Sequence, residues 1–191
     1  MKIVETALPG VVVIEPRVFP DDRGFFLEAL RAEQLVGLPD AAGLSMIQLN
    51  HSRSVLGTVR GLHFQEPNAQ AKLVWVTRGR ILDVVVDVRR GSPTFGRHVT
   101  AVLDDVEHRR MWIPAGFAHG FSVQSEVADC LYGCTAYYAP ASEHTVYWND
   151  PAIGIDWHTT NPIVSQKDAT APRLADAPVL PSYRAAPRGK S

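Results

Sequence analysis

The stretch LVWVTRGRILDVVVDV, residues 73–88, decides the fold class. It holds two apolar runs joined by a short segment with a glycine, a pattern typical of a β-hairpin. From Leu82 to Val88 every second side chain is leucine or valine, and these side chains share one face of an extended strand. Asp83 and Asp87 point to the other face. The stretch therefore predicts two consecutive strands that pair as a hairpin.

The rest of the chain repeats short apolar runs between Gly, Pro and Asp residues. Residues 99–103 and 111–113 are two further strand candidates. Residues 130–138 form a third candidate, with alternate side chains on one face. Only residues 32–36 and their neighbours indicate a short helix. Many short strands with such punctuation favour an all-β sandwich or barrel.

Length and charge limit the classes of protein that fit. The chain has 191 residues, 46% of them apolar and 20% charged, which suits one domain with a substantial core. A formal net charge of −1 gives no global field toward nucleic acid or a membrane surface, so we expect neither as a partner. No apolar run reaches the roughly 20 residues of a membrane span. The first residues lack the apolar core of a secretory signal, so we expect a cytoplasmic location.

We expect one domain over residues 1–175 and a loosely packed tail, rich in Pro and Ala, over residues 176–191. The two cysteines, Cys130 and Cys134, would share one face of their strand at a separation of about 13 Å. A disulfide needs Cα atoms within about 7 Å. We therefore predict two small buried thiols and no bridge.

Two segments place a histidine in a glycine-rich setting. They are GTVRGLHFQ at residues 57–65 and IPAGFAHG at residues 113–120. Together they resemble the two signature motifs of the cupin superfamily. The resemblance implies an all-β fold, the cupin-type antiparallel jelly roll or double-stranded β-helix, with a few short helices. His63 and His119 would then face one cavity.

The first motif departs from the usual metal-binding pattern of cupins. Gln65 occupies the position of the second histidine, and no acid stands at the position of the ligand glutamate. A stable first-row metal site needs three or more converging N, O or S donors, and the nearby Lys72 would repel a cation. We therefore expect a cavity that works without a metal or another cofactor.

A longer series of motifs makes the resemblance more specific. In chain order they are RGLHFQ (60–65), DVVVDVR (83–89), SPTFG (92–96), IPAGFAHGF (113–121), WNDP (148–151) and SQKD (165–168). This set closely resembles the dTDP-4-dehydrorhamnose 3,5-epimerase family. The resemblance runs from about Lys2 to Leu174, nearly the whole chain.

The resemblance implies a reaction and its catalytic groups. The reaction is epimerisation at C3 and C5 of dTDP-4-dehydro-6-deoxy-D-glucose to dTDP-4-dehydro-L-rhamnose, in dTDP-L-rhamnose biosynthesis. Inversion beside a ketone needs a base on one face of the sugar, an acid on the other, and a cation or donor at the ketone oxygen. By resemblance, His63 is the base, Asp168 its carboxylate partner, Tyr132 the acid, and Lys72 the group that stabilises the enolate oxygen.

The resemblance also implies contacts with the nucleotide and the sugar. The positions that match are Arg23, Phe26, Glu28, Gln48, Asn50, Arg60, His119, Tyr138, Glu143 and Lys167. Arg23 and Arg60 match contacts to the diphosphate or nucleotide, which suits the planar fork of arginine. Tyr138 matches the aromatic residue that stacks on thymine. Taken by itself, Arg23 would be a turn charge, since residues 21–24 fit a tight turn.

Two residues depart from the commonest family pattern. Gly133 follows Tyr132 where a lysine is frequent, and Leu49 lies between Gln48 and Asn50 where aspartate is common. On a strand, both would point away from their functional neighbours. We therefore expect small effects on catalysis.

Other functions stay open beside the double epimerase. A relative could invert one carbon only, or act as a ketoisomerase on another dTDP-deoxysugar, with the same catalytic groups. A noncatalytic sugar-binding cupin is the third alternative, but binding alone requires neither a base nor an acid. The resemblance further implies a homodimer, and we expect the N-terminal strand to contribute across the interface.

Overall fold

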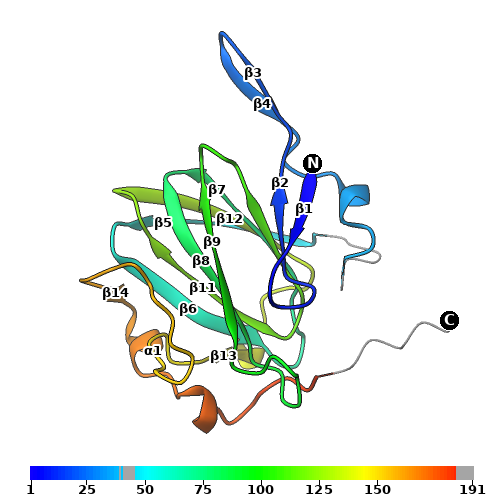
Figure 1. The fold of residues 1–191 in the computed structure, drawn as a ribbon. Helices are drawn as coiled ribbons and strands as arrows, with labels where there is room; N and C mark the ends of the chain where they lie inside the picture. Colours follow the sequence, from blue (N-terminus) through cyan, green and yellow to red (C-terminus); the bar gives the residue numbers. More distant parts are fainter. Residues whose placement is uncertain (39, 41–45, 184–191) are drawn as a thin grey trace, which may run out of the picture.

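The computed structural model describes residues 1–38, 40 and 46–183. Two six-stranded sheets face one another and form the jelly roll (Figure 1). Every pairing between neighbouring strands is antiparallel except a short parallel one at β14. The expectation of an all-β antiparallel jelly roll is confirmed.

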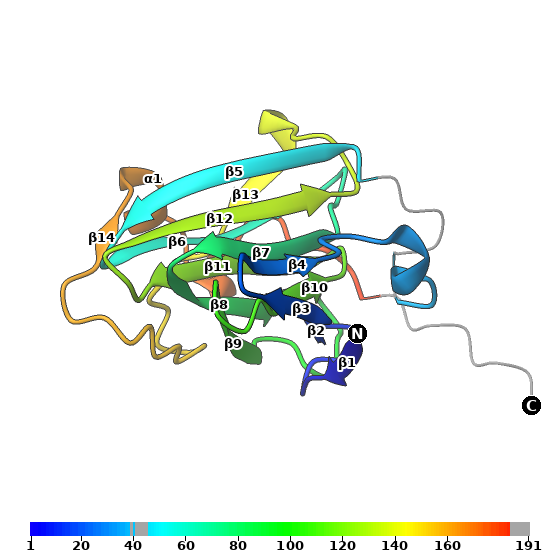
Figure 2. The same cartoon turned by 90° about the horizontal axis from the view of Figure 1, so that it is seen from above.

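The strand order within each sheet can be followed in Figure 2. The first sheet runs β1 (Lys2–Glu5), β2 (Val12–Glu15), β10 (Arg110–Ile113), β7 (Lys72–Arg78), β12 (Val127–Cys134) and β5 (Gln48–Val55). The second runs β13 (Glu143–Thr145), β6 (Thr58–Gln65), β11 (Phe117–Val123), β8 (Arg80–Asp87) and β9 (His98–Asp104), with β14 (Ile163–Val164) paired to β6.

Short helices and one hairpin complete the described part of the chain. Strands β3 (Val18–Asp21) and β4 (Gly24–Leu27) form a separate hairpin that projects from the body (Figure 1). The helices are 3₁₀ turns at Ala32–Leu35, Pro140–Ser142 and Leu174–Asp176, and helix α1 at Gln166–Ala169. The first of these lies where the sequence predicts a short helix. None of the helices in the described ranges is long and apolar enough to cross a membrane.

Period-two alternation puts the side chains of β8 in two different apolar clusters, one on each face of the strand. On β8, Ile81 and Val85 face the space between the sheets, together with Val74 of β7 and Phe121 of β11. The alternate residues of β8, from Leu82 onward, pack on the outer face of the second sheet against Trp157 and other residues of the C-terminal third. Strand β8 is therefore buried on both faces, and its two aspartates lie inside the barrel.

Residues 73–88 form two strands as predicted, but the predicted hairpin pairing is wrong. Strand β7 pairs with β10 and β12 in the first sheet, and β8 pairs with β9 and β11 in the second. The chain passes from one sheet to the other at Gly79, which has a φ of +79°. A Cβ there would lie 2.0 Å from the Val127 carbonyl oxygen, so only glycine fits this crossing.

The structure differs from two further predictions at one end of each predicted segment. The strand predicted over residues 130–138 ends at Cys134, and the chain turns away where the Thr135 amide bonds the Ala71 carbonyl. The first part of the expected tail packs on the barrel: Ala177 is buried, and the Tyr183 amide bonds the Arg90 carbonyl. Residues 184–191 lie outside the described residues. Both cysteines are free and buried, as predicted.

Strands β6 and β11 approach one another unusually closely beside the two motif histidines. A Cβ on Gly120 would lie 2.6 Å from the Arg60 carbonyl oxygen, and a Cβ on Gly61 would lie 2.6 Å from the Gly120 Cα. The register of the two strands shifts just beyond the His119–His63 pair. The two glycines therefore let the strands meet where both histidines enter the barrel.

We predict that Gly120→Ala destabilises the fold by about 1–3 kcal/mol, because the new methyl group meets rigid backbone. Gly133→Ala is the matched control, since its Cβ would meet only the Met46 side chain, with Sδ at 2.7 Å. A flexible side chain can move aside, so we expect a cost below about 1 kcal/mol. Urea unfolding of both variants measures the difference, and equal costs would contradict the close approach.

Candidate active site

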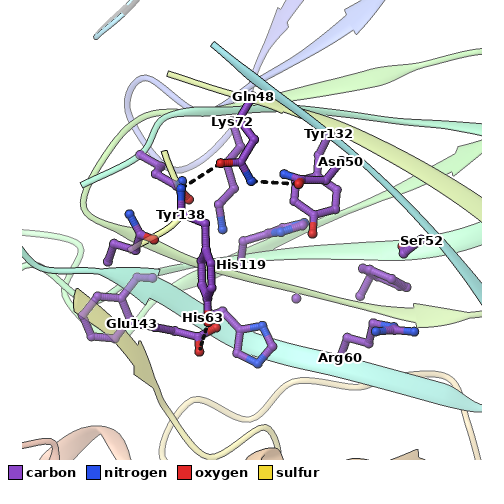
Figure 3. A pocket seen from close by; sticks show the side chains of 15 residues that line it. Gln48, Asn50, Ser52, Arg60, His63, Lys72, His119, Tyr132, Tyr138 and Glu143 are labelled. Carbon is purple, nitrogen blue, oxygen red and sulfur yellow. Dashed lines mark hydrogen bonds between the residues drawn. The ribbon is translucent and has the colours of Figure 1, made fainter. Parts of the chain in front are cut away.

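A cavity of about 370 Å³ lies between the two sheets. Its wall comes from inward-facing residues of both sheets and from the loop and strand that follow β12. Nine of the residues predicted from the sequence line it: Gln48, Asn50, Arg60, His63, Lys72, His119, Tyr132, Tyr138 and Glu143 (Figure 3). The structure therefore brings together groups from strands β5, β6, β7, β11, β12 and β13.

His63 and Asp168 form a hydrogen-bonded pair at the cavity wall. Nε2 of His63 lies 2.7 Å from Oδ1 of Asp168, and the carboxylate is buried. With Nε2–H donated to the carboxylate, the other ring nitrogen, Nδ1, is left to act as a base. The pairing predicted from the resemblance is present.

The local fold holds Asp168 in place behind the histidine. Helix α1 begins after Ser165, whose hydroxyl accepts a hydrogen bond from the Asp168 amide at 3.1 Å. The Gly61 amide lies 3.4 Å from Oδ2 of the same carboxylate. Burial alone would raise the pKa of Asp168, but the bonds from His63, Gly61 and Ser165 outweigh it and hold the pKa below its usual value. Asp168 is therefore an ionised partner at neutral pH.

Tyr132 enters the cavity from the opposite sheet. It lies on β12 in the first sheet, whereas His63 lies on β6 in the second. Burial raises the pKa of Tyr132, and the nearby acidic groups Cys134, Cys130 and Glu143 act in the same direction. Its hydroxyl is therefore protonated at neutral pH, the state that a proton donor requires.

Lys72 is a basic residue of the cavity wall. It lies on β7 with Val74 and Val76 on the same inward face, and Figure 3 shows its side chain extending beside His119. Burial lowers the pKa of Lys72, against the opposing influence of Cys134, Asp83 and Glu143. A desolvated ammonium of this kind interacts strongly with a developing oxyanion.

A chain of hydrogen bonds runs along the rim of the cavity (Figure 3). Gln48 donates from Nε2 to Asn50 Oδ1 at 2.8 Å, and its Oε1 accepts the Tyr138 amide at 2.8 Å. The Tyr138 hydroxyl donates to Glu143 Oε2 at 3.1 Å. Lys167 donates from Nζ to Glu143 Oε1 at 2.9 Å, which places Lys167 at the rim although it does not line the cavity. The network orients the Tyr138 ring at the cavity mouth.

Gln65 anchors the loop that carries Tyr138. Its Nε2 donates to the Asn68 and Tyr137 carbonyls at 2.8 and 3.3 Å, and its Oε1 accepts the Ala139 amide at 2.9 Å. The side chain at the second histidine position of a metal-binding cupin is thus engaged in loop contacts. Within the described ranges, no group of three His, Cys, Asp or Glu side chains is placed to hold a metal ion.

Three of the predicted site residues do not meet the cavity of their own chain. Arg23 and Phe26 lie on the β3–β4 hairpin, and Glu28 follows it. Arg23 sits in the expected tight turn, with Nη2 donating to Asp21 Oδ2 at 2.7 Å. The Phe26 side chain is 66% exposed. These residues are therefore available to a molecule outside this chain.

The polar residues of the site that were not predicted from the sequence include Ser52, Gln70 and Asp83. Ser52 lines the cavity, and Asp83 accepts a hydrogen bond from Nε2 of His119 at 2.7 Å. Oγ of Ser52 and Oδ2 of Asp83 are the buried side-chain oxygens without a hydrogen-bond partner in the described part of the chain. The position of Asp83 within an apolar strand could have indicated a site residue, because a buried carboxylate usually has a cation nearby.

The two departures from the family pattern are neighbours in space. Leu49 on β5 is the register partner of Gly133 on β12. Leu49 is exposed, and Gly133 lies beneath the Met46 side chain. Both alternate with the inward-facing residues of their strands, as predicted, so neither faces the cavity.

Comparison with known sequences identifies a family. A sequence model of the family described as dTDP-4-dehydrorhamnose 3,5-epimerase matches residues 5–176. The dTDP-4-dehydrorhamnose 3,5-epimerase of Pseudomonas aeruginosa is 49% identical over 185 residues, which cover 95% of this chain and 100% of that protein.

Solved structures agree with this match. The dTDP-6-deoxy-D-glucose-3,5-epimerase of Legionella pneumophila, in complex with dTDP-4-keto-L-rhamnose, aligns with a TM-score of 0.90 at 43% identity, covering 96% of this chain and 99% of that one. A 3'-monoepimerase from Streptomyces bikiniensis, in complex with dTDP-quinovose, aligns with a TM-score of 0.87 at 37% identity, covering 94% and 93%. From its sequence, its fold and the groups in its cavity, this chain belongs to the dTDP-4-dehydrorhamnose 3,5-epimerase family.

Proposed function

We propose that the chain epimerises C3 and C5 of dTDP-4-dehydro-6-deoxy-D-glucose and so makes dTDP-4-dehydro-L-rhamnose for dTDP-L-rhamnose biosynthesis. The observation that carries the proposal is the His63–Asp168 pair in one cavity with Tyr132 and Lys72. The names of the relatives support it, as does the keto-rhamnose nucleotide bound to the Legionella protein.

In this proposal the sugar lies between the two sheets, and each sheet supplies a catalytic group to one face of the sugar ring. Nδ1 of His63 takes the proton from a carbon beside the ketone, and the C–H electron pair becomes the double bond of an enolate. The ammonium of Lys72 stabilises the negative charge that develops on the ketone oxygen. Tyr132 then donates its hydroxyl proton to the opposite face of the same carbon, which inverts the centre. Asp168 stabilises the imidazolium that His63 becomes.

The residues at the rim bind the nucleotide. Tyr138 stacks on thymine, a contact of the order of 1–3 kcal/mol for a base on an aromatic ring. Arg60 binds the diphosphate, because its Nε is held by Ser54 Oγ at 3.0 Å and the rest of its guanidinium remains in the cavity wall. Gln48 and Asn50 contact the base and sugar. His119, Glu143 and Lys167 contact other parts of the substrate.

A single-site epimerase is the second candidate. The likeness to the Streptomyces bikiniensis 3'-monoepimerase favours it, since the same fold and a similar cavity serve inversion at one carbon there. The two functions differ in whether C5 exchanges its proton as well as C3. A measurement at both carbons therefore separates them.

We predict that incubation of the wild-type protein with the keto-sugar nucleotide in deuterated water inverts and labels both C3 and C5. His63→Ala should abolish both exchange and inversion, because no enolate forms, and Asp168→Asn should be nearly as damaging. Tyr132→Phe should still exchange at one or both carbons with retained configuration, because His63 can return a deuteron to the face it came from. Proton NMR at both carbons measures all four proteins.

The outcomes of this experiment distinguish the candidates. Labelling at only one carbon in the wild-type protein would favour the single-site epimerase. Inversion of both centres by Tyr132→Phe at the wild-type rate would show that another group is the acid. No exchange by the wild-type protein would leave sugar binding as the better reading.

We propose that the reaction needs no metal or other cofactor. Gln65 is committed to the loop of Tyr138, and Nε2 of His119 is committed to Asp83, so two candidate ligands are engaged. The ammonium of Lys72 in the same cavity opposes a second cation. Lys72 also supplies the positive charge that a metal would bring to the ketone oxygen.

We predict that activity after dialysis against a strong chelator stays within about twofold of the untreated protein. Metal analysis of the dialysed sample is the control that removal was complete. Loss of activity on chelation, restored by one specific metal, would contradict the metal-free mechanism.

We propose a homodimer in which the β3–β4 hairpin of one chain reaches the cavity of its partner. Phe25 and Phe26 are 57% and 66% exposed on a projecting hairpin, an arrangement that water disfavours and a partner surface would cover. The placement of Arg23, Phe26 and Glu28 outside their own cavity supports the same assembly. In a symmetric dimer each cavity would receive one hairpin.

We predict subunit complementation between two inactive variants, Arg23→Ala and His63→Ala. A mixed dimer would hold one cavity with both defects and one intact cavity, so random mixing should restore about a quarter of wild-type activity. Refolding the two variants together and separately, with size measured by sedimentation, checks this. Complete absence of restored activity in mixed dimers would contradict a shared site.

We propose that the protein acts in the cytoplasm, on a small-molecule substrate and without nucleic acid or membrane partners. The proposed substrate carries a charged diphosphate that an apolar bilayer does not admit unaided. The net charge of −1 also offers no general attraction to polyanions.

A further inference from the structure

Asp83 lies beneath the cavity, in the apolar interior of the barrel. It occupies the middle of β8, its side chain is fully buried, and it shares its face with Ile81 and Val85 of the core between the sheets. It does not line the cavity itself, but its partner His119 does. A carboxylate at this depth requires compensation by a nearby cation or by several donors.

Only one of the two carboxylate oxygens of Asp83 has a hydrogen-bond partner among the described residues. Oδ1 lies 2.7 Å from Nε2 of His119, whereas Oδ2 has no hydrogen-bond partner among the described residues. Asp87, the other buried acid of β8, is fully engaged by contrast. It accepts bonds from Arg89 at 2.9 and 2.7 Å and from the Ser92 and Thr94 hydroxyls at 2.6 Å. Of these two acids, Asp83 is therefore the one with a carboxylate oxygen that has no hydrogen-bond partner among the described residues.

Lys72 is the cation on which the charge of Asp83 acts. Three acidic groups act to raise the pKa of Lys72: Cys134, Asp83 and Glu143. The Cys134 thiol has a pKa raised by burial, so it is neutral at neutral pH. Glu143 is already bound to Lys167 and Tyr138. Asp83 is thus the acid whose charge is available to Lys72.

We propose that Asp83 is a positioning residue of the epimerisation, which orients the ring of His119 through Oδ1 and keeps Lys72 as an ammonium at the ketone oxygen through the charge on Oδ2. This inference rests on the proposed function, in which Lys72 stabilises the enolate. It gives the reaction a second buried carboxylate besides Asp168. Asp168 acts on the base, His63, whereas Asp83 acts on Lys72, which stabilises the ketone oxygen.

The charged and titratable groups around Lys72 come from strands of both sheets. They are Asp83 on β8, His119 on β11, His63 and Arg60 on β6, Tyr132, Cys130 and Cys134 on β12, and Glu143 on β13. Removing the charge of Asp83 leaves Lys72 desolvated with less to hold its proton. Its ammonium would then be lost at a lower pH than in the wild-type protein.

The test is Asp83→Asn, with Asp87→Asn as the matched control on the same strand. We expect Asp83→Asn to lower kcat at least tenfold while KM changes less than about threefold, because Lys72 acts mainly in the transition state. The alkaline limb of the kcat profile should move to lower pH by about one unit. Asp87→Asn should lower thermal stability and leave the position of that limb unchanged.

A double-mutant comparison ties the effect to Lys72. If Asp83 acts through Lys72, then Lys72→Gln and the double variant Asp83→Asn/Lys72→Gln should have kcat values within about threefold. An unshifted limb in Asp83→Asn, or a loss in the Lys72→Gln background as large as in the wild type, would overturn the proposal.

A measurement on the unaltered protein covers the case in which Asp83→Asn fails to fold. NMR of ¹³C,¹⁵N-labelled lysine side chains, with Lys72→Gln for assignment, reports the charge of Lys72 directly. We expect an ammonium at pH 7.5, and a neutral amine there would overturn the proposal. Because this reading needs no turnover, it stays valid if the wild-type protein fails to epimerise the keto-sugar, which separates the two failures.

Discussion

The hydrogen bond between His63 and Asp168 joins two residues that are 105 positions apart in the chain. It exists because β14 pairs with β6 and helix α1 follows directly, with Ser165 capping the turn that presents the carboxylate. The C-terminal third of the chain also covers the outer face of the second sheet, through Trp157 and Leu174. The segment that completes the core therefore also places the carboxylate partner of His63, so core packing and the geometry of the site depend on the same residues.

Polar side chains in the apolar interior of the barrel cost folding free energy, but they also interact more strongly there than in water. Inward-facing positions that hold valine and isoleucine elsewhere hold Lys72, Asp83, His119 and Tyr132 around the cavity. Burial raises the pKa of Tyr132 and lowers that of Lys72, so the same desolvation favours the neutral form of both side chains. Carboxylates placed behind the cavity offset the second effect. The polar interior thus holds two histidine–carboxylate pairs, His63 with Asp168 and His119 with Asp83.

The sequence predicts the class of fold and most of the site, and its failures have identifiable causes. Alternation in residues 80–88 correctly predicts the two faces of β8, but alternation does not say which strand is its neighbour. The chain crosses between sheets at Gly79, and that choice depends on long-range contacts with β9 and β11. Motifs locate His63 and Asp168, whereas the burial of both faces of β8, and with it the role of Asp83, becomes visible only in three dimensions.

Gln65 stands at the position of the second histidine in the cupin motif, and its amide makes different contacts from those of a histidine. A neutral imidazole offers one donor and one acceptor, whereas an amide offers two donors and an acceptor. Gln65 uses both kinds of group at once, on the carbonyls of Asn68 and Tyr137 and on the amide of Ala139. A histidine at this position could coordinate a metal, but it could not make all three of these contacts with the loop. The glutamine therefore fixes the loop that carries Tyr138, whose ring lines the cavity.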